Sequence, residues 1–147
     1  MRYDEESRAL ILAAGQKARA LGHSYVGSVH LLLALAQEPG QMGLLLCSAG
    51  VDPVAAEDLA LVLYGRGTAQ LPLPQGMTGT VRAILRDAAG EARFSRRARV
   101  TPVHILLALT RRQRTGAGLL LKLSGVYIEG LFSQTVDHMR WAKILIR

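Results

Sequence analysis

The sequence contains very few of the residues that build disulfide-linked, metal-stabilised or aromatic-rich folds. Cys47 is the only cysteine among 147 residues, which excludes an intramolecular disulfide and any metal site made of several cysteines. Hydrophobic residues make up 50% of the chain but aromatic residues only 5%, so most of the apolar side chains are Leu, Ala and Val. This composition favours closely packed helices over a β-sandwich.

Long apolar runs and targeting signals are also missing. The apolar stretches, such as residues 31–36, are far too short to cross a bilayer, and the acidic N-terminus differs from a signal peptide. No Gly-x-x-x-x-Gly-Lys-Ser/Thr motif is present, so we expect no P-loop for a nucleoside triphosphate. The sequence therefore predicts a cytoplasmic protein that is not an enzyme, needs no metal or other cofactor, and does not associate with membranes.

The net charge of +7 is distributed unevenly along the chain. Residues 1–74 carry 5 Lys and Arg against 7 Asp and Glu, whereas residues 75–147 carry 13 against 4. Two groups of arginines supply most of the excess: Arg93, Arg96, Arg97 and Arg99, then Arg111, Arg112 and Arg114. An acidic surface on another protein is therefore a candidate partner for the second half.

An internal repeat is the strongest feature of the sequence. A shift of 74 residues aligns residues 29–35 with 103–109 at six identical positions of seven, and upstream Arg8-Ala9 aligns with Arg82-Ala83. At a shift of 75, residues 43–46 align with 118–121. Matched blocks in the same order indicate a duplication of one structural unit.

Each repeat predicts four helices. The first helix of the second repeat places an apolar residue at i, i+3, i+4, i+7 and i+11, and the fourth helix of the first repeat opens at Asp52-Pro53. In that fourth helix we expect Ala55, Leu59, Val62 and Leu63 to face the core. The predicted fold is all-α, with eight helices in two pseudo-twofold four-helix repeats packed as a single domain over residues 1–147. The predicted boundaries are repeat one at 1–64, a linker at 65–78, repeat two at 79–139 and a basic tail at 140–147.

The repeat carries a family resemblance. Residues 21–35 and 100–109 resemble the N-terminal domain of the Clp family of AAA+ unfoldases, whose repeat contains Leu-Gly-His, then Thr-Glu-His or Pro-Glu-His, then Leu-Leu-Leu-Ala-Leu. The resemblance covers about residues 3–139. It implies an eight-helix, pseudo-symmetric fold that docks substrates or adaptor proteins for a Clp ATPase and protease. Either the chain is part of a longer unfoldase, or it is a stand-alone homologue that captures partners; in isolation we expect a monomer.

Two positions depart from the family pattern. Val29 and Val103 stand where relatives carry Glu, which in some relatives receives the guanidinium of a phosphorylated arginine. In those relatives, residues at the start of the first helix of each repeat receive the phosphate. In this chain Thr78 and Arg82 still stand at phosphate-facing positions of the second repeat, whereas in the first repeat Asp4 stands where relatives have a Thr. We therefore expect weak or no phosphoarginine binding, with Thr78 and Arg82 supporting Val103 in the better preserved second pocket. Apolar side chains should suit both pockets.

Other candidate sites have simpler explanations. His30 and His104 are equivalent by repeat symmetry, which places them in opposite halves and favours a structural role over a shared metal or acid–base site. Cys47 lies in an apolar run and is expected to be a buried small hydrophobe rather than a nucleophile. The alternative function is a basic helical nucleic-acid-binding protein, although few aromatics and no known nucleic-acid motif support it. The predicted partner-binding residues are Val29, Val103, Thr78, Arg82, Arg93, Arg96, Arg97 and Arg99.

Overall fold

The computed structural model confirms an all-helical fold of two four-helix repeats. It describes residues 2–70 and 74–145, with side chains through Arg140, so linker residues 71–73 and tail residues 146–147 lie outside the described part. The helices of the first repeat are α1 Glu5–Ala20, α2 Ser28–Gln37, α3 Gln41–Ser48 and α4 Pro53–Tyr64. Those of the second are α5 Gly79–Phe94, α6 Pro102–Arg111, α7 Gly116–Leu123 and α8 Ile128–Leu145. Four two-residue strands, which the sequence did not predict, accompany them: β1 Arg2–Tyr3, β2 Tyr25–Val26, β3 Gly76–Met77 and β4 Arg99–Val100.

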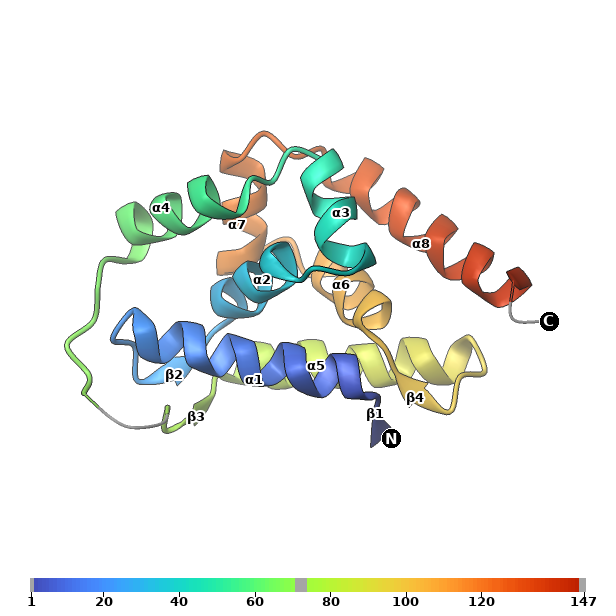
Figure 1. Cartoon of the computed structure of the whole chain (residues 1–147), viewed down its shortest axis with the longest axis horizontal. Helices are drawn as coiled ribbons and strands as arrows, with labels where there is room; N and C mark the ends of the chain where they lie inside the picture. Colours follow the sequence, from blue (N-terminus) through green and yellow to red (C-terminus); the bar gives the residue numbers. More distant parts are fainter. Residues whose placement is uncertain (1, 71–73, 146–147) are drawn as a thin grey trace.

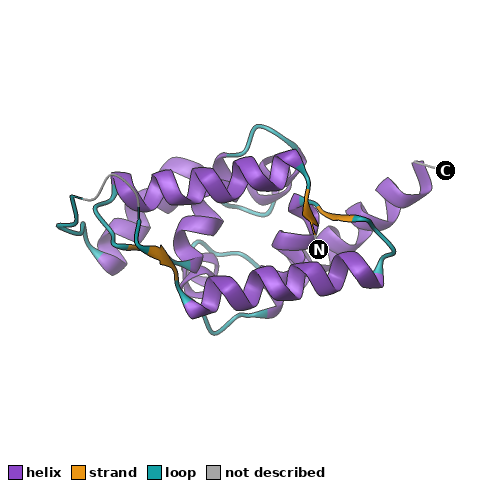
Figure 2. Cartoon of the chain, turned by 90° about the horizontal axis from the view of Figure 1, so that it is seen from below, coloured by secondary structure: helices purple, strands orange, loops and turns teal. Residues whose placement is uncertain are grey.

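The helices are stacked in layers. Helices α1 and α5 form the base, α2 and α6 lie above them, and α3, α4, α7 and α8 cover the top (Figure 1). Seen from below, α1 and α5 lie in front, with short strand pairs between their ends (Figure 2). The second helix of each repeat is therefore enclosed on several sides.

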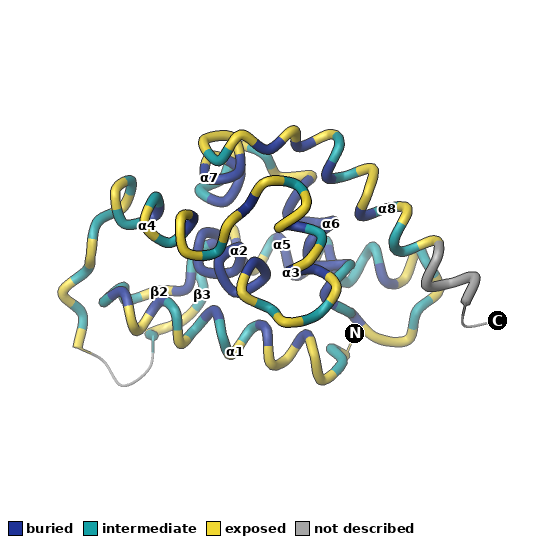
Figure 3. Tube along the Cα trace, turned by 45° about the horizontal axis from the view of Figure 1, so that its top comes forward, coloured by how far each residue is buried: buried dark blue, intermediate teal, exposed yellow. Residues whose placement is uncertain are grey.

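This enclosure explains the apolar character of α2 and α6. Every residue from 28 to 36 in α2 is buried, and so is every residue of α6 from 104 to 110 (Figure 3). A helix that is apolar all round needs such a position. By contrast, α1 and α5 bury only one stripe each, and in α5 the stripe consists of the predicted residues Val81, Ile84, Leu85, Ala88 and Ala92.

The strands join the two repeats crosswise. β1 pairs in parallel with β4, bringing Tyr3 beside Val100, and β2 pairs in the same way with β3. The buried Ser7 hydroxyl donates to the carbonyl of Val100 at 3.0 Å, and the buried Ser28 hydroxyl accepts from the backbone N–H of Ala117 at 3.1 Å. The start of each repeat therefore packs against the entrance to the second helix of the other repeat.

The predicted inner face of α4 is correct for Leu59 and Leu63, which pack against the core, and wrong for Ala55 and Val62. This helix buries Ala56 and Ala60, whereas Ala55 is exposed and Val62 is 81% exposed. Because most positions of α4 are apolar, periodicity could not identify the packed face. The two alanines are small enough to let α4 lie close to α2 and α7, the helices it packs against.

The structure also defines three smaller features of the helices. Cys47 is exposed rather than buried, because α3 packs through Met42, Gly43 and Leu46 on another face. The N-cap of α2 is Gly27. Helix α8 continues to residue 145, so most of the predicted tail is helical. None of the helices in the described ranges is both long and apolar enough to cross a membrane.

Candidate functional site

Two pockets lie at the starts of α2 and α6, in places related by the internal repeat. The α2 pocket has a volume of about 410 Å³ and the α6 pocket about 350 Å³. The α2 pocket is lined by Leu21, His23, Tyr25, Gly27, Ser28, Val29, His30, Ala60, Tyr64, Thr78, Thr80 and Gly116. The α6 pocket is lined by Asp4, Glu6, Glu38, Gln41, Met42, Arg97, Thr101, Pro102, Val103, His104, His138 and Met139. At shifts of 74 or 75 residues most of these positions correspond.

Each pocket draws residues from both repeats. Thr78, at the start of α5, lines the α2 pocket together with Val29, whereas Asp4, at the start of α1, lines the α6 pocket with Val103. This follows from the crosswise strand pairing. The predicted combination of Thr78 with Val103 is therefore wrong: the two halves of each site are exchanged between the repeats. Arg82 lines neither pocket.

The α2 pocket has apolar walls. Leu21, Val29 and Ala60 are buried side chains in its lining, and Tyr25 and Tyr64 are about half exposed, at 50% and 46%. Thr78 and Thr80 add hydroxyl groups. The lining described contains no Asp, Glu, Lys or Arg, so it can hold an aliphatic or aromatic side chain without desolvating a charge.

A chain of hydrogen bonds fixes the two histidines of the α2 pocket. The backbone N–H of Gly27 donates to His30 Nδ1 at 2.8 Å, so the proton of neutral His30 lies on Nε2. That proton is donated to His23 Nδ1 at 2.7 Å, and His23 Nε2–H donates to the Gly65 carbonyl at 2.9 Å. Burial and the neighbouring His23 lower the pKa of His30 to about 4. His30 thus caps α2 and, through His23, holds the chain as it leaves α4.

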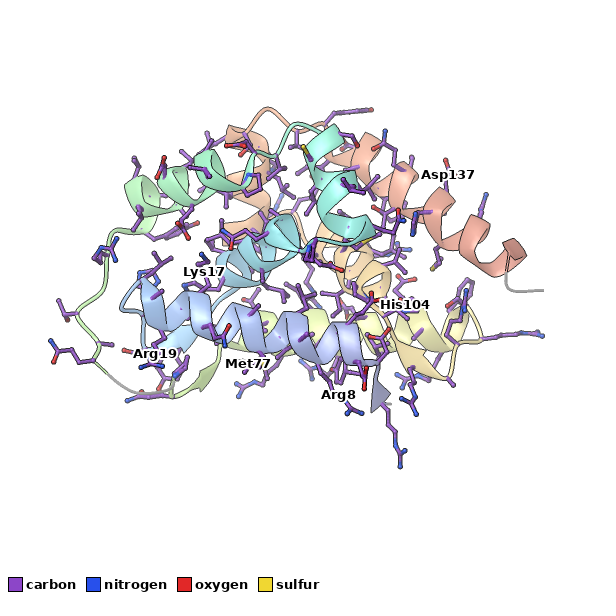
Figure 4. The ribbon with its side chains drawn as sticks, viewed as in Figure 1. Arg8, Lys17, Arg19, Met77, His104 and Asp137 are labelled. Carbon is purple, nitrogen blue, oxygen red and sulfur yellow. The ribbon has the colours of Figure 1, made fainter. Side chains whose placement is uncertain are left out.

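His104 has the equivalent role at α6 (Figure 4). Its Nδ1 accepts from the backbone N–H of Thr101 at 2.9 Å, and its Nε2 lies 3.2 Å from the Ser95 hydroxyl. Burial, followed by the charge of Arg97, lowers the pKa of His104 to about 4, against a smaller raising effect of Asp4. Both histidines accept the N-cap N–H as Glu or Gln does in a capping box. Within the described residues, no three His, Cys, Asp or Glu form a group that could hold a metal.

The α6 pocket is acidic where the α2 pocket is apolar. Asp4 Oδ1 accepts from the backbone N–H of Ser7 at 2.7 Å, and one oxygen of Glu38 is buried without a hydrogen-bond partner. Burial, then Glu6 and Asp4, raises the pKa of Glu38. The α6 pocket therefore has carboxylates although Val103 stands where relatives carry Glu. They come from Asp4, Glu6 and Glu38, all far in sequence from Val103.

The arginines predicted as one group are dispersed. Arg97 lines the α6 pocket, Arg99 pairs with Arg2 across the β1–β4 strands, and Arg96 is exposed in the turn after α5 with a φ of 58°. Arg93 lies with Arg82 in a separate groove on α5.

The second arginine group is partly neutralised. Arg111 forms an ion pair with Glu91 at 2.7 Å, and Arg112 forms one with Asp87 at 2.7 Å. The hydrogen bond from Arg112 to Asp87, with the charge of Asp87, raises the pKa of this guanidinium. The free basic surface of the second repeat therefore centres on α5 rather than on the end of α6.

Sequence reasoning missed the contributions of His23, Tyr25, Tyr64 and Glu38. The Leu-Gly-His preceding α2 was a signal for His23, since it belongs to the repeat motif. No sequence signal pointed to Tyr64 or Glu38, because each reaches its pocket from a helix end that periodicity cannot place.

The chain is similar to known proteins over nearly its whole length. The family described as Clp repeat (R) N-terminal domain matches residues 2–123. The ATP-dependent Clp protease ATP-binding subunit ClpA homolog of Cyanidium caldarium is 29% identical, covering 92% of this chain but 16% of that protein. Chaperone protein ClpC1, chloroplastic, of Oryza sativa subsp. japonica is 27% identical over 92% of this chain and 15% of that protein. The chain thus spans less than a fifth of these relatives.

Solved structures share the fold at lower identity. The N-terminal domain of ClpD from Arabidopsis thaliana superimposes with a TM-score of 0.80 at 20% identity, covering 94% of this chain and 97% of that one. The Hsp104 N-terminal domain from Candida albicans gives a TM-score of 0.74 at 19% identity, covering 93% and 91%. At these identities the likeness concerns the fold alone.

Proposed function

Because the chain belongs to the Clp repeat N-terminal domain family, we propose that it is a non-catalytic module that docks a substrate or adaptor protein for a Clp ATPase. The observation that carries the proposal is the α2 pocket, whose apolar walls receive one aliphatic or aromatic side chain of the partner. His30 accepts the N-cap N–H of α2 and is hydrogen-bonded to His23, so the two histidines serve the shape of the pocket rather than proton transfer. We place the module in the cytoplasm, as a monomer without a cofactor.

The two pockets provide an internal comparison for this proposal. Val29 and Val103 are equivalent in sequence, yet one lines an apolar pocket and the other a pocket with three carboxylates. A carboxylate introduced at Val29 changes the character of its pocket, whereas one introduced at Val103 joins existing acids. The same substitution therefore distinguishes docking in the α2 pocket from nonspecific adhesion.

We expect Val29→Glu to weaken binding of an apolar peptide about tenfold to a hundredfold, because burying one Leu or Phe side chain contributes roughly 1.5 to 3 kcal/mol. The probe is a fluorescent peptide with Leu and Phe between Gly and Ser residues, titrated by anisotropy. The matched control Val103→Glu should bind within about threefold of wild type. Equal loss in both variants, or loss in neither, would contradict docking in the α2 pocket; circular dichroism checks that each variant is folded.

Phosphoarginine should bind poorly to the wild-type protein, for a different reason in each pocket. The α2 pocket has the Thr78 hydroxyl but no carboxylate for the guanidinium. The α6 pocket has carboxylates, but Asp4, Glu6 and Glu38 together outnumber Arg97 and repel a phosphate. A charge-assisted hydrogen bond contributes about 1.5 to 3 kcal/mol, so a supplied carboxylate should strengthen binding roughly tenfold or more.

Calorimetric titration of free phosphoarginine checks this expectation. Affinity should rise in Val29→Glu, where Thr78 is present, and not in Val103→Glu. Tight binding by the wild type would contradict the expected weak affinity. A gain confined to Val103→Glu would contradict the placement of Thr78 beside Val29.

A further inference from the structure

A third concave surface runs along α5 on the base of the molecule. We call it the arginine groove; its volume is about 770 Å³ and it is lined by Tyr3, Met77, Gly79, Arg82, Leu85, Arg86, Ala89 and Arg93. Arg82, Arg86 and Arg93 are spaced i, i+4 and i+11, which places them on one face of the helix. All three are exposed. The groove thus presents a row of guanidinium groups above an apolar floor.

The charges of this row are not balanced within the chain. The acids of α5 are paired: Asp87 with Arg112, the residue after α6, and Glu91 with Arg111, the last residue of α6. Among the residues whose side chains are described, none of Arg82, Arg86 and Arg93 forms an ion pair. Two arginines spaced i and i+4 repel each other and destabilise a helix slightly, so an anionic ligand would relieve a cost already present in the free protein.

More positive charge lies beside the groove. β1 carries Tyr3 into the lining, and the β1–β4 pairing sets Arg2 opposite Arg99, both exposed. No Asp or Glu is among the lining residues described. The positive electrostatic potentials of these arginines add together at the base of the molecule, which therefore attracts anions.

We propose that the arginine groove binds an extended acidic segment of a partner protein. The guanidinium fork suits bidentate binding of carboxylates, and Leu85, Ala89 and Met77 supply apolar surface between the arginines for the segment's aliphatic side chains. Arg82 and Arg93 are about 16 Å apart along the helix at 1.5 Å per residue. An extended chain covers that length in about five residues, so two or three carboxylates alternating with aliphatic residues match the row.

This surface is separate from the α2 pocket. The two share no lining residue, so either can fail without the other. A nucleic acid is the competing occupant, but Tyr3 is the only aromatic residue described in the lining, which limits stacking on bases.

The first repeat supplies a matched control. Arg8 and Arg19 on α1 correspond to Arg82 and Arg93 at the shift of 74, with the same spacing and also exposed. They project from α1 on the lower side of the molecule (Figure 4). The double reversal Arg8→Glu with Arg19→Glu therefore changes the net charge as much as Arg82→Glu with Arg93→Glu, on the other helix of the base.

The test is anisotropy titration of the full chain with a fluorescent peptide of alternating Glu and Leu, at low and at physiological salt. We expect the α5 double variant to lose on the order of tenfold or more in affinity, and the α1 double variant to stay within about threefold. A peptide with Gln in place of Glu should bind at least tenfold more weakly than the acidic peptide. An equal loss of affinity in the two double variants would mean that the peptide responds only to net charge, which would overturn the proposal. Tighter binding of random-sequence duplex DNA than of the peptide at physiological salt would overturn it in favour of a nucleic-acid surface.

Discussion

Lowering the pH from 7 to 5 should reduce the free energy of unfolding by about 2 kcal/mol for each of His30 and His104, because their pKa values are about 4 in the folded protein and near 6.5 when unfolded. Between those values the unfolded chain binds more protons than the folded one. The stability contributed by the neutral histidines is therefore complete above about pH 6.5 and is lost as the pH falls toward 4. Two such losses are a large share of a typical domain stability of about 5 to 15 kcal/mol.

The structural reason lies in the hydrogen bonds of the two capping sites. A second proton on His30 or His104 would have to lie on Nδ1, which already accepts the N-cap N–H. His23 faces His30, and Arg97 and Asp4 are the charged groups that act on His104. Protonation would therefore set two donors against each other inside buried helix starts.

Urea denaturation at pH 7 and pH 5 measures the effect. Gln at each position can still accept the N-cap N–H but does not titrate, so His30→Gln with His104→Gln should lose less than about 1 kcal/mol over the same interval. His138→Gln is the control and should keep the full loss. Glu38, whose pKa is raised, contributes in the opposite direction, because the folded state then binds protons more readily than the unfolded state. If the double variant keeps the wild-type pH dependence, the capping histidines do not cause it.

Two glycine-to-alanine substitutions in the second repeat should change stability in opposite directions. A Cβ added at Gly118 in α7 would overlap the backbone carbonyl of Gln113, whereas one added at Gly90 in α5 meets nothing within 4 Å. Overpacking against a backbone costs about 1 to 3 kcal/mol, and we expect Gly118→Ala to fall at the upper end because the carbonyl cannot rotate away. Gly90→Ala should instead stabilise by about 0.5 to 1 kcal/mol, the ordinary gain in a helix interior.

The repeat gives this prediction a second instance. Gly43 is equivalent to Gly118 at the shift of 75, and a Cβ there would overlap the backbone carbonyl of Glu38. Gly43→Ala should therefore lower the unfolding midpoint as Gly118→Ala does. Thermal and urea unfolding of the three variants decide the matter. Stabilisation by Gly118→Ala would show that α7 can move away from the end of α6, contrary to the packing described.

The sequence alone determined the helices and the repeat, because these depend on local spacing. Buried stripes at helical period, such as Ile84, Ala88 and Ala92, and the cap Asp52 lie within one or two turns of the residues they organise. The shift of 74 residues likewise established that the two halves share one fold. Where local spacing was uninformative, as in the almost wholly apolar α4, the prediction was only half right: Leu59 and Leu63 pack against the core, but Val62 was expected inside and is exposed.

Only the tertiary structure decided what each pocket contains. The strands β1 to β4 have two residues each, too few to show a period, yet they carry Thr78 to Val29 and Asp4 to Val103 across the repeats. Two nearly identical motifs, residues 29–35 and 103–109, thereby line pockets of different chemistry, one apolar and one acidic. The same holds for charge: a count along the chain cannot tell that Arg112 is paired with Asp87 while Arg82 remains free in the described structure, because pairing depends on which helix faces pack together.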